Sequence, residues 1–192
     1  MRILIVEDNS AVLMGLQMMV ENIGHEVVDA IGDAEIALRR ILETQPDLVL
    51  MDINLSSKMS GIDIFHQVKL QADIPFLFIT AYSSSDLMRR TSELGAIGYI
   101  VKPVTEDQLR AQILLGMDRY AEIKKAQQEA SYYKKSLEER KTIERAKGIL
   151  MDRLNIKEAD AMSKMQKRSR DNNVKLVKVA EDIIKANEYL SL

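Results

Sequence analysis

The chain has 192 residues, a formal net charge of −2 and a hydrophobic content of 46%. This is enough for one domain of ordinary size and a smaller partner, each with its own core. We expect a soluble, cytoplasmic protein without disulfides, because the sequence has no cysteine, no export signal and no apolar run near the roughly 20 residues that span a bilayer.

Short β-branched runs alternate with helical patterns over the first 117 residues. Asn9 or Ser10, and later Asp33, are suitable caps for the first two helices. Repeated strand–helix units predict an α/β fold with a doubly wound, five-stranded parallel sheet. We expect strands at residues 2–6, 26–30, 48–51, 76–80 and 98–101, and helices at residues 10–23, 33–44, 61–71 and 84–94.

A fifth helix begins near residue 105 and meets no strong break before Leu150. Its middle is highly charged and has sparse apolar positions, spaced mostly by three or four, at Tyr120, Ile123, Ala126, Ala130, Tyr133 and Leu137. This spacing is typical of a weak coiled-coil seam, although a single solvated helix held by charge pairs fits the same pattern.

Two further helical stretches, residues 156–171 and 174–188, follow turns that contain asparagine, which tolerates the left-handed conformation that ends a helix. We therefore expect a small three-helix, all-α domain at the end of the chain. The predicted division is a first domain at 1–118, a helical linker with coiled-coil character at 119–136 and a second domain at 137–192.

Charge is distributed unevenly between these parts. Residues 1–118 carry 9 Lys and Arg against 17 Asp and Glu, whereas residues 119–178 carry 17 against 9. An acidic part joined to a basic part indicates two different kinds of partner, the basic part being suited to a polyanion. A solvated helix rich in Lys and Glu is the alternative reading.

Polar residues end four of the predicted strands. The first strand leads into Glu7 and Asp8, the third into Asp52, the fourth into Thr80 and the fifth into Lys102. In a doubly wound sheet the carboxyl ends of the strands form the ligand crevice. Carboxylates brought together there repel one another unless a cation neutralises them, and Mg²⁺ prefers such oxygen ligands.

A site of this kind can accept a phosphoryl group. Asp52 is the candidate nucleophile because it ends the central strand, between the other acids and the lysine. Mg²⁺, the Lys102 ammonium and the Thr80 hydroxyl would stabilise charge on the phosphoryl oxygens. Each residue alone has an ordinary structural explanation, but their appearance at the ends of four strands in order indicates a functional site.

These residues lie in motifs that resemble the receiver domain of bacterial response regulators, a flavodoxin-like fold. The resemblance covers roughly residues 1–120 and rests on residues 6–9, 50–54, 79–81 and 101–103. It implies phosphorylation of Asp52 by a sensor histidine kinase. One departure is the loop at 54–61, which is longer and richer in serine than is usual in the family.

The resemblance also implies roles for individual residues. Mg²⁺ would be held by Asp8, Asp52 and the backbone carbonyl of Asn54, with Glu7 acting through water. The peptide bond between Lys102 and Pro103 would be cis. Tyr99 falls at the position of the family's switch aromatic, which turns inward as Thr80 moves toward the phosphoryl group; a buried core tyrosine is the alternative.

Three apolar stripes in the tail predict a small helical core, formed by Ile143, Ala146, Leu150 and Leu154, by Met162, Met165 and Ser169, and by Leu176, Val179, Ala180 and Ile183. Basic residues lie opposite the second stripe and suit a phosphate backbone, although a solvated surface is the alternative. The candidates are Lys164, Lys167, Arg168 and Arg170, and on the preceding helix Arg140, Arg145 and Lys147.

Nothing in the tail predicts a second enzyme. His25 and His66 are isolated, and no P-loop, nucleophile elbow or dinucleotide fingerprint occurs. We therefore expect no enzymatic activity beyond the Mg²⁺-dependent phosphorylation and dephosphorylation of the receiver itself.

Residues 137–151, 158–161 and 175–184 resemble the ANTAR domain of transcription antitermination regulators. The resemblance implies binding to hairpins in nascent RNA, which prevents a terminator from forming. Lys157 replaces the usual capping Ser or Thr, at a cost of about 1 kcal/mol, and Met162 stands where an aromatic residue is common.

A phosphorylation-controlled RNA-binding antiterminator that pairs as a homodimer when phosphorylated is thus the leading hypothesis. The alternative keeps the receiver but makes the tail a DNA-binding or protein-interaction module. A stand-alone phosphorelay carrier fits poorly, because it has no need of a basic helical tail.

Overall fold

A computed structural model describes residues 1–81 and 95–189 of the chain. The helix expected at 84–94 lies outside the described residues. The chain forms two compact units, Met1–Lys124 and Lys125–Leu192, and each is described by itself. None of the helices in the described ranges is long and apolar enough to cross a membrane.

A parallel five-stranded sheet forms the centre of the first unit and confirms the predicted fold class. Its strand order is β2-β1-β3-β4-β5, so the direction of the connections reverses beside β1. Each predicted strand is present, and its observed ends differ from the predicted ends by at most one residue. The strands are β1 (Arg2–Val6), β2 (Glu26–Ile31), β3 (Leu48–Asp52), β4 (Phe76–Thr80) and β5 (Gly98–Val101).

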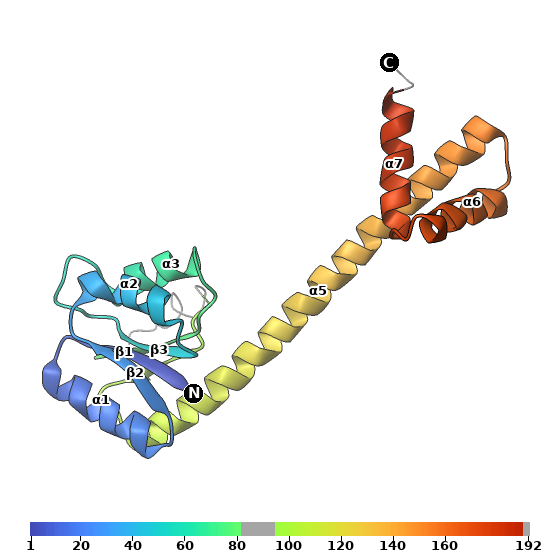
Figure 1. The fold of residues 1–192 in the computed structure, drawn as a ribbon. Helices are drawn as coiled ribbons and strands as arrows, with labels where there is room; N and C mark the ends of the chain where they lie inside the picture. Colours follow the sequence, from blue (N-terminus) through green and yellow to red (C-terminus); the bar gives the residue numbers. More distant parts are fainter. Residues whose placement is uncertain (82–94, 190–192) are drawn as a thin grey trace. The chain divides into compact units, whose positions relative to one another are not determined.

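Helices cover both faces of this sheet (Figure 1). α1 (Ser10–Asn22) and the first turns of α5 (Glu106–Leu154) pack on one face, and α2 (Ala34–Thr44) and α3 (Gly61–Lys69) pack on the other. The predicted caps are confirmed, because the Asn9 side chain accepts hydrogen bonds from the first turn of α1 and Asp33 does the same for α2.

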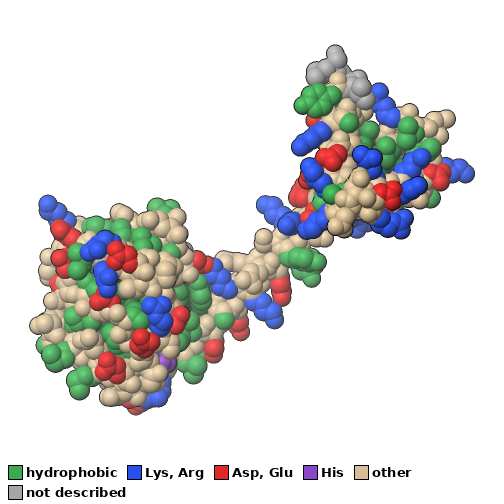
Figure 2. All heavy atoms as spheres, in the orientation of Figure 1, with side chains coloured by type: hydrophobic (Ala, Val, Ile, Leu, Met, Phe, Trp, Pro, Cys, Tyr) green, Lys and Arg blue, Asp and Glu red, His purple; other side chains and the backbone are tan. Residues whose placement is uncertain are grey.

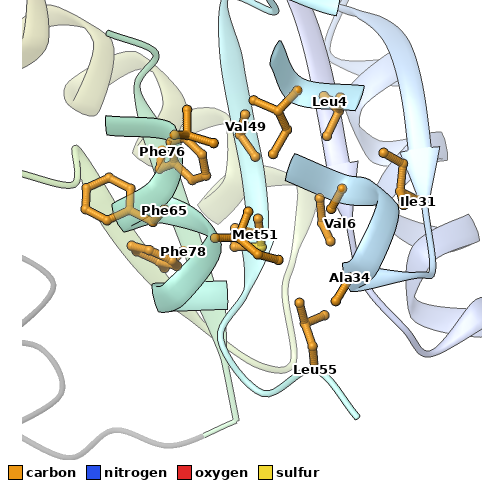
Figure 3. Close-up of a cluster of buried hydrophobic side chains, with 14 of the residues drawn as sticks. Leu4, Val6, Ile31, Ala34, Val49, Met51, Leu55, Phe65, Phe76 and Phe78 are labelled. Atoms are coloured by element: carbon orange, nitrogen blue, oxygen red, sulfur yellow. The ribbon is translucent and has the colours of Figure 1, made fainter. Parts of the chain in front are cut away.

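The larger of the two cores lies between the sheet and α2 and α3. Phe65 of α3 contacts Phe76 and Phe78 of β4 edge to face, with ring centroids 5.0 and 5.5 Å apart (Figure 3). All five residues of β3 are buried, as expected for the central strand of a sheet covered on both faces. This packing fixes the position of Asp52 at the end of β3.

Side chains of the first part of α5 hold this helix to the first unit. Leu109 and Ile113 are buried in the core beside α1. The Tyr120 hydroxyl donates a hydrogen bond of 2.9 Å to the carbonyl oxygen of Asp73, and Lys124 forms an ion pair with the Asp73 carboxylate. Tyr120 was expected in the coiled-coil seam; that expectation is wrong, because the residue is held against the loop before β4.

The second unit contains the remainder of α5, α6 (Glu158–Asp171) and α7 (Leu176–Tyr189). Asn155 and Asn173 both have φ of 52°, which confirms the predicted left-handed turns. Leu154 was expected in the core but is 52% exposed, so the first stripe ends at Leu150. The core consists of Ala146, Met165, Val179 and Ala180, with Ile143, Leu150, Leu176, Ile183 and Ile184 packed around it.

Candidate functional site

The ends of β1, β3 and β5 bring four charged residues together, which we call the acidic pocket: Glu7, Asp8, Asp52 and Lys102. Ligand oxygens of the three carboxylates lie within 4.8 Å of one another. Glu7 and Asp52 are almost fully buried, with exposed fractions of 1% and 3%. The Lys102 Nζ lies 2.7 Å from Asp52 Oδ2 and 2.8 Å from Glu7 Oε2. A single ammonium group thus faces two buried carboxylates.

This crowding changes the acidity of the groups. Burial raises the pKa of Glu7; the Lys102 hydrogen bond opposes the rise and the charge of Asp52 adds to it, leaving the pKa above its ordinary value. Burial lowers the pKa of Lys102, but its bonds to Asp52 and Glu7 outweigh this effect and leave its pKa raised. Proton binding by Glu7 and Lys102 is therefore favoured, as expected where two buried carboxylates face one ammonium group.

The donor set fits a hard divalent cation. Glu7 Oε2, despite its contact with Lys102, is the one buried side-chain oxygen in the described ranges without a well-oriented hydrogen bond. The half-buried Asp8 carboxylate completes a group of three acids whose oxygens are close enough to share one ion. Oxygen-only ligands of this kind suit Mg²⁺.

The loop that departs from the family pattern, residues 54–61, is tied to the acidic pocket. The Ser56 amide donates a hydrogen bond of 2.6 Å to Asp8 Oδ2, and bonding to Ser56 lowers the pKa of Asp8. The backbone amide of Asn54 donates a hydrogen bond of 3.0 Å to Asp52 Oδ1. A Cβ on Gly61 would lie 2.1 Å from the Asp52 carbonyl oxygen, so only glycine fits there. Sequence reasoning missed Ser56 because no motif marks it.

Thr80 and Tyr99 lie on the neighbouring strands. Thr80 is 2% exposed and pairs in register with Val101, one residue before Lys102. Tyr99 is half-buried and packs on the core beside α2 and α3. Its switch role stays a prediction. The Lys102–Pro103 peptide bond is cis, as the resemblance implied.

Four cations of α6 form what we call the basic face. All four side chains are exposed, and none forms an ion pair with another residue in the described part of the chain. In Figure 2, Lys and Arg side chains gather around hydrophobic ones on this unit. The basic face comprises Lys164, Lys167, Arg168 and Arg170.

The candidate cations of α5 differ among themselves. Arg140 is exposed, and Arg145 lies 3.4 Å from Glu188 of α7. Lys147, expected among the RNA contacts, is only 7% exposed. Its Nζ lies 2.6 Å from a Glu144 oxygen and 2.7 Å from a Glu158 oxygen. We therefore correct its assignment: Lys147 joins α5 to α6 and its charge is already neutralised.

Lys147→Met should lower the melting temperature of the protein, whereas Lys164→Met, the same change on the basic face, should not. The hydrogen bond from Lys147 lowers the pKa of Glu158 in the folded protein below its ordinary value of 4.5. The ion pair therefore stabilises the fold fully above pH 4.5, and this stabilisation is lost as the pH falls through the pKa that Glu158 has in the folded protein. Helical circular dichroism during heating should show the difference at pH 7 and its decline below about pH 4.5. If the melting temperatures of Lys147→Met and the wild type differ as much in acid as at pH 7, the ion pair is not the cause of the difference.

Comparisons with known proteins match both units. Residues 3–114 match the response regulator receiver domain, and residues 133–184 match the ANTAR domain. The transcriptional regulatory protein PdtaR of Mycobacterium tuberculosis is 33% identical over 183 residues, which cover 95% of this chain and 89% of PdtaR.

Solved receiver structures match the first part of the chain. A response regulator receiver domain protein of Clostridium thermocellum has a TM-score of 0.57 at 27% identity, covering 64% of this chain and 98% of its own. The CheY-like receiver protein of Methanospirillum hungatei has a TM-score of 0.56 at 30% identity, covering 63% and 96%. The fold that carries the acidic pocket is therefore that of a receiver domain.

Proposed function

The chain belongs to the two-component response regulators that join a receiver domain to an ANTAR domain, and from this premise we propose that it is an RNA-binding antiterminator controlled by phosphorylation of Asp52. Both of these domains are regulatory. One observation carries the proposal: a single chain combines a buried acidic pocket around Asp52 with a basic face whose cations are not neutralised by the described residues.

Asp52 would receive the phosphoryl group from a histidine of a sensor kinase in the cytoplasm. A carboxylate oxygen of Asp52 attacks phosphorus, the bond from phosphorus to the imidazole nitrogen breaks, and the histidine keeps the electron pair. Lys102 lies 2.7 Å from Asp52 and would stabilise charge on the phosphoryl oxygens, and the Thr80 hydroxyl would donate to them.

Mg²⁺ would be held by Asp8, Asp52 and the backbone carbonyl of Asn54, with Glu7 acting through water. The ion would neutralise charge that Lys102 cannot balance alone and stabilise the phosphoryl oxygens during transfer. All three carboxylates have a partner that can orient them, because Lys102 contacts Asp52 and Glu7 and the backbone amide of Ser56 donates to Asp8.

Phosphorylation would act by pairing two protomers along α5. Residues 125–138 of this helix are exposed throughout. Ile123, Tyr133 and Leu137 are 46%, 70% and 54% exposed, and with Ala126 and Ala130 they keep the alternating spacing of a coiled-coil seam. Such a short seam is weak alone, so a change in the receiver can decide whether the dimer forms.

The basic face would contact the phosphates of an RNA hairpin. Hairpin RNA should bind the full-length protein more tightly than duplex DNA of equal charge, because loops expose bases that a duplex conceals. A gel shift at matched salt, with and without acetyl phosphate and Mg²⁺, compares the two. Equal affinity for the two nucleic acids would contradict RNA as the ligand and favour the DNA-binding alternative, and binding to neither would favour a protein partner.

A further inference from the structure

A pocket of about 430 Å³ opens between the helices of the second unit. This volume falls within the range of about 300–1,000 Å³ typical of small-ligand sites. α5, α6 and α7 all contribute to its walls, and its apolar lining includes side chains of the small core. The residues that matter here are Leu150, Met165, Val179, Ile183, Lys164 and Arg168.

The lining combines an apolar recess with two exposed cations. Met165 and Val179 are 1% and 5% exposed and continue directly into the core. Lys164 and Arg168, one helical turn apart on α6, are exposed, belong to the basic face and are not in ion pairs within the described ranges. An apolar recess beside two available cations suits a molecule that carries a flat apolar group next to a phosphate.

We propose that this pocket binds one unstacked base from the loop of an RNA hairpin. The base would enter between α6 and α7, and Lys164 and Arg168 would hold the phosphates on either side of it. Asp182 also lines the pocket and can accept a hydrogen bond from an amino group on the base edge. The inference rests on the proposed RNA binding and adds to it a site for reading the loop.

Charge decides between a nucleotide and other occupants. An apolar side chain from a protein partner or a second copy would bring no negative charge to Lys164 and Arg168, and the carboxylate of Asp182 is already paired with Lys178 at 3.2 Å. A nucleotide supplies both the flat ring and the negative charge. Phosphate contacts alone would need only the exposed cations and no recess. The position of these two cations on the pocket wall therefore favours a nucleotide.

Filling the pocket tests this assignment without changing any charge. Ala186 of α7 is exposed and lines the pocket, so Ala186→Phe should occupy the space of the base. Ala159→Phe is the matched control, because Ala159 is exposed on α6 and does not line the pocket. The probe is an RNA hairpin selected for tight binding from a library with a randomised loop. Ala186→Phe should weaken its binding about tenfold, with an unchanged salt slope, and Ala159→Phe should have no effect.

Abasic substitution along the loop identifies the base. One abasic position in the loop should lower the affinity of the wild type for the hairpin about tenfold. The same abasic position should change the affinity of Ala186→Phe little, because the pocket is already filled. Ala186→Leu serves in the same cycle if the phenylalanine variant loses its helical signal. The pocket assignment would be overturned, while RNA binding stands, if the Ala186 variants bind the hairpin with full affinity. It would also be overturned if the abasic position lowers the affinity of the wild type and of the variant equally. Failure of the wild type to select any hairpin would overturn the proposed function itself.

Discussion

Asp52→Asn should abolish phosphorylation while preserving the fold. The amide matches the carboxylate in shape but is not a nucleophile. Its single oxygen can keep the hydrogen bond from Lys102 or the one from the backbone amide of Asn54, but not both, because the two donors bind different oxygens of Asp52. The substitution also removes one negative charge from a crowded pocket, so stability should not fall. Incubation with acetyl phosphate and Mg²⁺ should add one phosphoryl group to the intact mass of the wild type and none to the variant.

Asp33→Asn is the matched control for this experiment. Asp33 caps α2, and asparagine caps a helix as well as aspartate does, so this variant should be phosphorylated normally. Continued phosphorylation of Asp52→Asn would place the phosphoacceptor elsewhere.

Loss of phosphorylation should also remove dimerisation. Pairing along α5 places two basic faces on one assembly, and two linked sites can bind about 100-fold more tightly than one. Sedimentation with beryllofluoride and Mg²⁺ should show a dimer for the wild type and a monomer for Asp52→Asn. If the wild type is equally dimeric without the activator, and the variant binds paired hairpins as tightly, control does not act through dimerisation.

The acidic pocket could be predicted because its residues follow regular elements. Once a run such as β3 is recognised as a buried parallel strand, the sheet itself fixes where its carboxyl end lies, and Asp52 and Lys102 must converge although they are 50 residues apart. An error of one residue in a predicted strand boundary does not alter this conclusion. The five strands therefore contained most of the information about the pocket.

Irregular segments and helix contacts could not be predicted in this way. Ser56 reaches Asp8 across 48 residues from a loop that has no periodicity. Helical spacing assigns Lys147 to a face of α5 but cannot tell that Glu158 of α6 will cover it. In the same way Tyr120 satisfies the spacing of the seam, yet a hydrogen bond to Asp73 holds it on the receiver. In each case a partner distant in sequence decides the environment.

Replacing the whole basic face by alanine should remove most of the electrostatic part of RNA binding. Each phosphate contact contributes about 0.7 to the slope of log affinity against log salt on single strands and about 0.9 on duplex, so four lost contacts should flatten the slope by about 3. Affinity near physiological salt should fall about 100-fold or more. Fluorescence anisotropy of a labelled hairpin over a salt series measures both quantities.

The control must carry the same change in net charge elsewhere in the chain. Four exposed cations of α5 provide it, because they lie outside the three-helix core and alanine suits their helix. They are Arg119, Lys125, Lys134 and Lys135. Both variants are measured without an activator, so that pairing along α5 does not contribute. With this control the slope should stay near that of the wild type, since release of counterions depends on cations that touch phosphate and not on total charge. If both quadruple variants lose the same slope, long-range charge and not the basic face determines binding. If the basic-face variant keeps its helical signal together with full affinity and slope, the RNA surface lies on another part of the protein.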